Sequence, residues 1–230
     1  MTHLITVLLT GVVSWVAPSA ASTVPTSEVA TLRGSVRVSA PSASAPAPSS
    51  PYSRRRSIPP QNPGTARGAE DAFVYLEPLD GPATSATPSP AQVLQRDRTI
   101  MPHVTAVQVG QLVEFPNDDD VFHNLFSLSS ENTFSLGRYA PGVTETHEFE
   151  QPGVVRLFCD IHAEMAGVIL VVDTPFLSRV EADGRYDISS VPAGSYRAIA
   201  WHPTAGADTT VIRLEDGAIA TADFSLVSAP

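Results

Sequence analysis

The chain has 230 residues, of which 43% are hydrophobic, and its formal net charge is -10. This length and composition suffice for one or two domains with a buried core. The excess of acidic residues argues against a nucleic acid as partner and favours a partner with a basic face. The single cysteine, Cys159, excludes a disulfide within the chain.

Residues 1–21 are predicted to be a signal peptide. The apolar run LITVLLTGVVSWV is too short to span a bilayer and lies where the apolar region of a signal peptide belongs. The small residues Ser19 and Ala21 fit cleavage after Ala21. We therefore expect a periplasmic or secreted protein that has no membrane span once the signal is removed. A retained membrane anchor is the alternative.

Residues 22–71 are predicted to hold a short strand and a linker. LRGSVRV (32–38) alternates as a strand does. The segment 39–68 is rich in Pro, Ser and Ala and contains three consecutive arginines. Such a segment buries too little apolar surface to fold by itself.

Residues 72–173 are predicted to form a β-sandwich domain. Short runs of β-branched and aromatic residues are separated by Pro, Gly, Asn and Asp, and no sustained helical period occurs. The expected strands are AFVYLEP (72–78), VLQRDRTI (93–100), VTAVQVG (104–110), LVEFP (112–116), VFHNLF (121–126), TETHEFE (144–150), VVRLF (154–158) and GVILVV (167–172).

Residues 174–230 are predicted to form a small β-sandwich module. Asp-Gly turns in ADGRY and LEDGA separate strand-like runs. A segment of this size is small for an independent core. The module is therefore expected to pack on the first domain or to borrow the strand at 32–38.

The stretch LFCDIHAEM contains three soft donors, Cys159, His162 and Met165. Their spacing also fits one face of a core helix, but such a helix would separate Cys159 from Met165 by about 9 Å. The strand-like runs on both sides favour a loop between two strands. A tight loop can turn all three side chains towards one point.

A fourth donor is expected from His123. In a strand VFHNLF, Val121, His123 and Leu125 share one face, which directs the histidine into the sandwich. One thiolate, two imidazoles and a weak thioether form the ligand set of blue-copper sites. Zinc would prefer a carboxylate to the thioether, and Asp160 or Glu164 could supply one.

The motifs FPNDDDVFHNLFS and LFCDIHAEM resemble the copper site of type 1 (blue) copper cupredoxins of the plastocyanin/amicyanin group. They are particularly similar to bacterial plastocyanin-like proteins labelled methylamine-utilisation proteins. DGRYDISSVPAGSYRAIAWHP resembles the transthyretin-like modules found as carboxypeptidase regulatory domains. The resemblance implies an all-β fold, with a cupredoxin-like Greek-key β-sandwich at 72–173 and a small β-sandwich module at 174–230.

The same resemblance implies one type 1 copper ion, with His123, Cys159 and His162 as strong ligands and Met165 as the axial one. The function of the protein would be the transfer of single electrons between redox partners through Cu(II)/Cu(I), without enzymatic activity. His162 would be the ligand nearest to solvent.

Other residues acquire supporting roles from the resemblance. Asn124 would hold the ligand loop by a hydrogen bond beyond the first ligand shell. Asp160 replaces the small polar residue that commonly follows the cysteine, and its charge would lower the copper potential. The acidic residues at 118–120 and Glu164 could orient a basic partner.

Two other functions stay open on the sequence. The copper could be bound for trafficking or storage, or the loop could serve only as a docking platform. A hydrolase with Cys159 as nucleophile and His162 as base is disfavoured, because no third group that would orient the histidine is evident.

Overall fold

The computed structural model describes residues 29–39, 68–81 and 88–228. The signal peptide predicted at 1–21 lies outside these residues, as does nearly all of the predicted linker. The described chain is all-β, as predicted, and its single helical segment is the 3-10 turn η1 (Ala69–Asp71). None of its described helices is long and apolar enough to cross a membrane.

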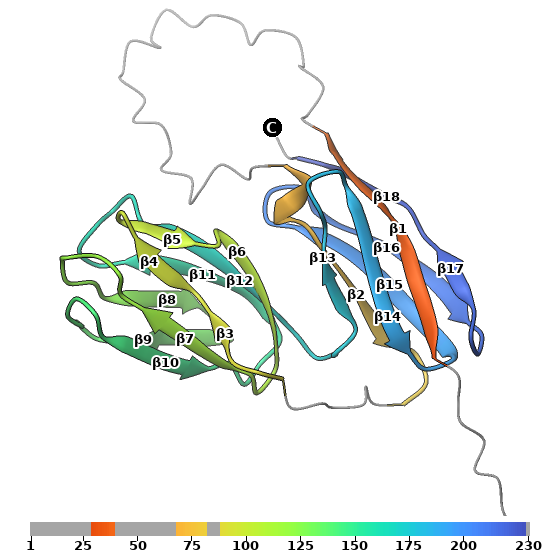
Figure 1. Ribbon diagram of the computed structural model, residues 1–230, viewed down its shortest axis with the longest axis horizontal. Coiled ribbons are helices and arrows are strands. Elements are labelled where there is room, and N and C mark those ends of the chain that lie inside the picture. The colour runs from red at the N-terminus through yellow and green to blue at the C-terminus, as the bar shows by residue number, and fades with distance from the viewer. Residues whose placement is uncertain (1–28, 40–67, 82–87, 229–230) are drawn as a thin grey trace, which may run out of the picture.

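The strands form two units that lie side by side (Figure 1). The central unit consists of β3 (Ala91–Gln92), β4 (Leu94–Arg96), β5 (Thr99–Met101), β6 (Val104–Gln108), β7 (Leu112–Pro116), β8 (Leu125–Ser129), β9 (Asn132–Ser135), β10 (Thr144–Glu148), β11 (Gly153–Cys159) and β12 (Ala166–Val172). The flanking unit consists of β1 (Ala30–Ser39), β2 (Phe73–Pro78), β13 (Leu177–Arg179), β14 (Arg185–Val191), β15 (Gly194–His202), β16 (Gly206–Leu214), β17 (Ile219–Thr221) and β18 (Phe224–Val227).

The central unit is a sandwich of two sheets. One sheet has the order β6-β12-β11-β8-β9 and the other the order β10-β7-β3, while β4 and β5 form a hairpin. Inward-facing side chains alternate along the strands, so that Phe115 of β7 and Leu157 of β11 meet in one buried cluster. Cys159 and Met165 belong to this cluster. The loop that carries the candidate ligands is therefore anchored in the core.

The flanking unit contains the strand predicted at 32–38. β1 pairs antiparallel with β14 on one side and parallel with β17 and β18 on the other. The flanking unit thus contains this strand, which agrees with the expectation that the C-terminal module borrows it. Gly184 (φ 85°) and Gly217 (φ 68°) take the left-handed conformation in the predicted Asp-Gly turns.

The strand β2 lies in a different unit from the one that the sequence suggested. The sequence placed it in the 72–173 sandwich, but it pairs with β13 and β15 of the flanking unit. Its alternating side chains explain this position, because Val74 and Leu76 enter the flanking core while Phe73 and Tyr75 face the other unit. The central unit is therefore inserted between β2 and β13.

An apolar junction joins the two units. The strand β12 faces both of them: Ile169 and Val171 lie in the central core, whereas Val168, Leu170 and Val172 pack in a separate cluster with β2 and β15. Burial on both faces accounts for the uninterrupted apolar run in the sequence of this strand.

Two predicted strands have different boundaries in the structure. VLQRDRTI is a hairpin, in which Asp97 and Arg98 form the turn with φ of 53° each. A two-residue turn without glycine lacks the usual sequence signal. In VFHNLF the strand begins only at Leu125, and His123 makes an isolated bridge with Tyr139.

Candidate metal centre

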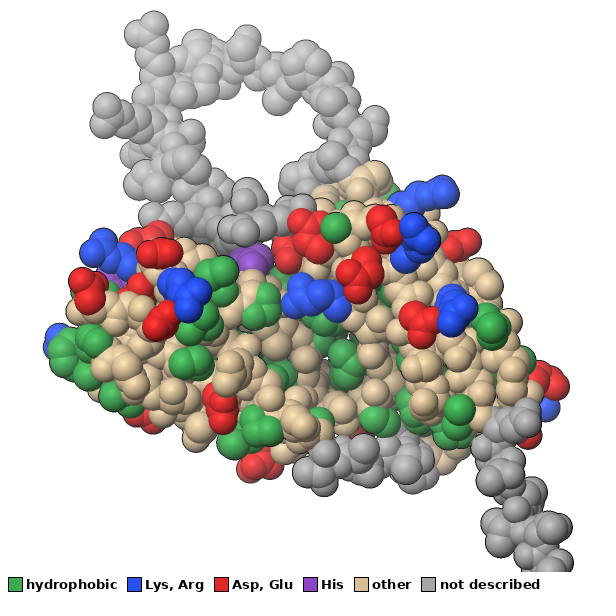
Figure 2. Space-filling view, in the orientation of Figure 1, with side chains coloured by type: hydrophobic (Ala, Val, Ile, Leu, Met, Phe, Trp, Pro, Cys, Tyr) green, Lys and Arg blue, Asp and Glu red, His purple; other side chains and the backbone are tan. Residues whose placement is uncertain are grey.

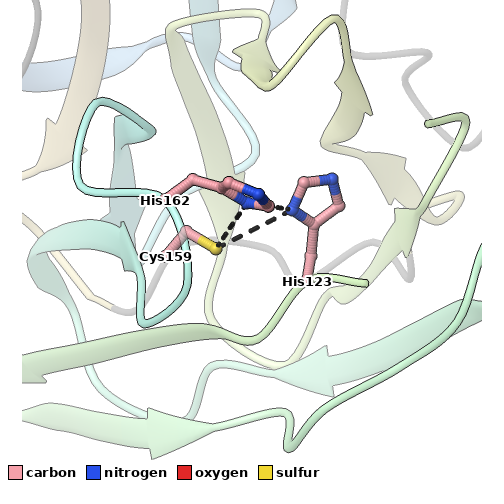
Figure 3. Close-up of side chains that lie close together, drawn as sticks. All are labelled: His123, Cys159 and His162. Carbon is pink, nitrogen blue, oxygen red and sulfur yellow. Dashed lines mark hydrogen bonds between the residues drawn. The ribbon is translucent and has the colours of Figure 1, made fainter. Parts of the chain in front are cut away.

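One thiol and two imidazoles meet at one end of the central sandwich. Cys159 ends β11, His162 lies in the loop between β11 and β12, and His123 approaches from the loop before β8 (Figure 3). The Sγ of Cys159 is 3.8 Å from the Nδ1 of His123 and 3.8 Å from the Nδ1 of His162. The two Nδ1 atoms are 3.2 Å apart. Three of the four predicted ligands thus point at each other.

The spacing of these three atoms fits a single metal ion. A point in their plane lies about 2.1 Å from each atom, close to the usual lengths of metal–nitrogen bonds (about 2.0–2.1 Å) and metal–sulfur bonds (about 2.3 Å). Lone pairs on neighbouring donors repel each other at such distances unless a proton or a cation lies between them. The cluster is therefore suited to hold a positive ion.

His123 is fixed from its backbone and from its far ring nitrogen. Its side chain is 0% exposed, and its backbone N–H and C=O bond to Tyr139 at 3.1 and 2.9 Å. Its Nε2 lies 2.8 Å from Oδ2 of Asp119. A carboxylate only accepts hydrogen bonds, so Nε2 carries the hydrogen and Nδ1 presents its lone pair to the cluster.

The ligand loop is a tight turn closed by backbone hydrogen bonds. The N–H of Cys159 donates to the carbonyl of Met165 at 3.2 Å, and the N–H of Met165 donates to the carbonyl of His162 at 3.1 Å. The N–H of Asp160 donates to the backbone carbonyl of Asn124 at 3.0 Å, which ties this loop to the loop that carries His123. The helical alternative for this stretch is therefore wrong.

The other predicted site residues lie close to this loop in different roles. Met165 is 1% exposed and shares the buried cluster of Cys159. Asn124 ties the loop through its backbone, whereas its side-chain Oδ1 accepts from the hydroxyl of Ser135 at 3.1 Å. Asp160 is exposed at the surface.

The donors of the cluster differ in their exposure to solvent. Cys159 is 6% exposed and His123 is fully buried, but His162 is only partly buried. Its neighbours in the loop, Ile161 and Ala163, are exposed. His162 therefore links the buried cluster to the protein surface.

Two of the three aspartates before His123 have partners within the protein. Asp118 pairs with the guanidinium of Arg96 at 2.7 Å, and Asp119 is bonded to His123. Asp118 and Asp120 are exposed, as is Glu164 on the ligand loop.

The carboxyl group of Asp119 is strongly hydrogen-bonded. Desolvation by burial opposes its ionisation, but hydrogen bonds from His123 and from the backbone of Arg98 and Asp97 outweigh it and lower the pKa of Asp119. The group is thus held as a carboxylate beside the imidazole. Sequence reasoning missed this contact, because nothing in NDDDVFH shows which of three consecutive aspartates turns inward.

A buried tyrosine lies behind the cluster. The hydroxyl of Tyr139 donates to Oε1 of Gln95, and Gln95 is fully buried. Burial is the main cause that raises the pKa of Tyr139, and electrostatic interactions with Cys159 and Glu145 raise it further. Tyr139 therefore stays neutral and supports His123 through the backbone bridge.

Comparisons with known proteins find solved structures that resemble part of the chain. No protein family and no curated protein matches the chain. A purple cupredoxin from Nitrosopumilus maritimus is 26% identical, with a TM-score of 0.33, over 36% of this chain and 99% of its own. A reduced Cu(I) form of an amicyanin mutant is 16% identical, with a TM-score of 0.34, over 43% of this chain and 99% of its own.

A copper-containing nitrite reductase from Thermus scotoductus SA-01 is 25% identical, with a TM-score of 0.36. This match covers 42% of the present chain and 25% of the reductase. Because all three TM-scores are low, the assignment of the site rests on its own donor atoms.

Proposed function

We propose that this protein is a mononuclear copper protein that transfers single electrons between redox partners, in the periplasm or outside the cell. The observation that carries the proposal is the convergence of one thiol and two imidazole Nδ1 atoms on one point at the end of the sandwich. Copper, when bound there, supplies one-electron chemistry between Cu(II) and Cu(I).

The donor set favours copper over zinc. Within the described residues, the cluster of possible ligands contains His123, Cys159 and His162 but no carboxylate. Asp160 and Glu164, the substitutes that zinc would need, are exposed on the loop. The remaining soft donor is the buried thioether of Met165, which suits a copper site and is a poor zinc ligand.

The residues around the cluster keep the donor atoms in place. His123 is held at its backbone and at Nε2, and Cys159 is held at its amide, so neither depends on a metal for its position. A site that is preorganised in this way requires little rearrangement when the charge on the ion changes. Rapid electron exchange needs this property, and a site for metal delivery does not.

The partly exposed His162 provides the path by which an electron would enter or leave. The proposed carrier acts by close approach to another protein and not by turnover of a substrate, so we infer that it is not an enzyme. Asp120 and Glu164 are exposed on the two loops of the site and would favour a partner with a basic face. The classification among bacterial plastocyanin-like proteins stays a prediction.

Repeated redox cycling separates electron transfer from copper trafficking. The copper-loaded protein is reduced and reoxidised several times in the presence of a Cu(I) chelator, and the retained copper is measured after each cycle. An electron carrier keeps its copper and exchanges electrons rapidly with its own oxidised form. Transfer of most of the copper to the chelator after the first reduction would contradict the proposal and support trafficking.

A further inference from the structure

The side chain of Asp119 bonds to Nε2 of His123, on the side of the ring that faces away from the cluster, and this geometry gives it a role at the candidate metal centre. The carboxylate Oδ2 lies 2.8 Å from Nε2, and the two side chains are 9% and 0% exposed. The opposite ring nitrogen, Nδ1, faces Cys159 and His162. The imidazole is therefore bound on one side by a carboxylate and turned on the other side towards the site.

The position of this carboxylate is itself fixed by a neighbouring hairpin. Its Oδ2 also accepts the backbone N–H of Arg98 at 3.1 Å, in the turn between β4 and β5. The N–H of Asp119 donates to Oδ1 of the buried Asn117 at 3.1 Å, and Nδ2 of Asn117 donates to the carbonyl of Val121 at 2.8 Å. The loop 117–121 is thus folded around its own hydrogen bonds, and Asp119 has little freedom to leave the histidine.

On the basis of the proposed copper function, we propose that Asp119 is a positioning residue of the metal centre, which orients His123 and favours Cu(II) over Cu(I). A carboxylate that accepts from the far nitrogen of a ligating imidazole fixes the tautomer and makes the coordinating nitrogen a stronger donor. A negative charge in this buried position also stabilises the ion of higher charge more than the ion of lower charge.

This assignment differs from the one that the sequence suggested. The resemblance gave the potential-lowering charge to Asp160, which is exposed and therefore screened by water. The side chain of Asp119 is only 9% exposed and is bonded directly to His123. The buried charge is thus expected to dominate the exposed one.

The test compares Asp119→Asn with Asp118→Asn in the full copper-loaded protein. The two substitutions remove the same charge from adjacent positions, but Asp118 is about half exposed and pairs with Arg96, not with His123. The measurements are the Cu(II) and Cu(I) affinities, the midpoint potential and the visible and EPR spectra. Thermal unfolding shows whether each variant is folded.

We expect Asp119→Asn to weaken Cu(II) binding by about 10- to 100-fold. Cu(I) binding should weaken less, so the midpoint potential should rise. Asp118→Asn should leave both affinities and the potential nearly unchanged, because exposed ion pairs contribute little. Equal effects of the two substitutions would overturn the positioning role while leaving the copper function intact.

A measurement without metal keeps this inference separate from the proposed function. Long-range nitrogen–proton NMR correlations report which ring nitrogen of His123 carries the hydrogen in the metal-free protein. Wild type should show the Nε2–H tautomer, and Asp119→Ala should show a mixture. An Nδ1–H tautomer in the wild type would overturn the inference, whatever the result with copper.

Discussion

At the scale of single residues, each donor of the cluster is held through atoms that it does not offer to a metal. His123 is held by its backbone and by Nε2, and Cys159 by its amide. His162 accepts the N–H of Met165 with its carbonyl, and its Nδ1 stays directed at the cluster. The donor atoms are thus positioned by the fold before any ion is bound.

His202 in the flanking unit has a structural role. It is 1% exposed, its Nε2 donates to the carbonyl of Gly68 at 3.2 Å, and its Nδ1 accepts the N–H of Ala205 at 3.1 Å. Burial lowers the pKa of His202, although Gly68, Asp71 and Glu70 oppose the shift. Protonation of Nδ1 would remove the acceptor for Ala205.

The lowered pKa of His202 predicts a loss of stability in mild acid. The unfolded chain takes up a proton near the ordinary pKa of about 6.5, whereas the folded protein resists it. The free energy of unfolding should therefore fall as the pH decreases below this value. Urea unfolding of metal-free wild type and His202→Asn at several pH values measures the effect, and the variant should show a shallower dependence. Parallel curves would contradict the structural role.

In the cluster of His123, Cys159 and His162, the sequence predicted which residues come together but not the contacts that hold them. The spacing of Cys159, His162 and Met165 predicted a loop because strand-like runs flank it, and this is confirmed. The contact of Asp119 with His123 depends on the fold of the loop 117–121 and on the β4–β5 turn. Neither has a local signal that distinguishes one aspartate from the next.

At the scale of elements, β1 requires a glycine, Gly34, at the point where its parallel neighbour changes from β17 to β18. Residues 31–33 pair with β17, and residues 36–39 pair with β18. Between them, the chain passes so close to Gly34 that an added Cβ would lie 1.7 Å from the backbone carbonyl oxygen of Ala222. A backbone atom cannot turn away as a side chain can, so only glycine fits at this point.

Gly34→Ala is accordingly predicted to destabilise the protein by at least about 3 kcal/mol, which is the upper range for overpacking. Ser35→Ala is the control, because it removes only a hydrogen bond from Oγ to Asp223 at 2.8 Å and should cost about 1 kcal/mol. Urea unfolding gives both values. A cost for Gly34→Ala no larger than that of the control would show that the strands can separate at this point.

Strand content could be predicted from sequence more fully than strand boundaries. Short runs of β-branched and aromatic residues between turn residues identified β6, β7, β10, β11 and β12. VFHNLF was wrong as a continuous strand, since the loop hydrogen bonds of Asn117 and the bridge to Tyr139 replace regular pairing before Leu125. The prediction of one continuous strand in VLQRDRTI was wrong. The hairpin turn at Asp97 and Arg98 contains no glycine, so the sequence lacks the usual signal for a turn.

At the scale of the whole molecule, Arg179 connects the two units. Its guanidinium donates to the carbonyl of Glu70 at 2.9 Å and to the carbonyl of Val104 in the central unit, and it lies 4.7 Å above the ring of Phe73. Burial lowers the pKa of Arg179, but arginine stays charged at any ordinary pH. On the face of the molecule that Figure 2 shows, basic and acidic side chains are interspersed.

Arg179→Met is predicted to loosen the junction. Two backbone carbonyls would lose a charged donor, and each such hydrogen bond contributes about 1.5–3 kcal/mol. The fluorescence of Trp201, which packs in the junction cluster, should then change at a lower urea concentration than in wild type. Arg185→Met is the control, because Arg185 is 78% exposed and pairs only at the surface. Equal midpoints for the two variants would contradict a connecting role for Arg179.

The insertion of one unit into the other could not be predicted from the sequence. The pattern AFVYLEP predicts a strand, but it does not identify the strands that pair with it. Its partner β15 lies more than one hundred residues away, and the register of Leu76 opposite Ala198 follows from the assembled sheet. Long-range pairing of this kind has no local sequence signal.

The most direct test of the proposed copper site is the spectrum of the protein after addition of one equivalent of Cu(II) to the metal-free form. Ligation of copper by the thiolate of Cys159 should give an intense visible band from thiolate-to-copper charge transfer and a narrow copper hyperfine splitting in EPR. Both features should disappear in Cys159→Ser, which removes the thiol from a position only 6% exposed. A weak, ordinary Cu(II) spectrum that Cys159→Ser leaves unchanged would contradict the proposed copper site.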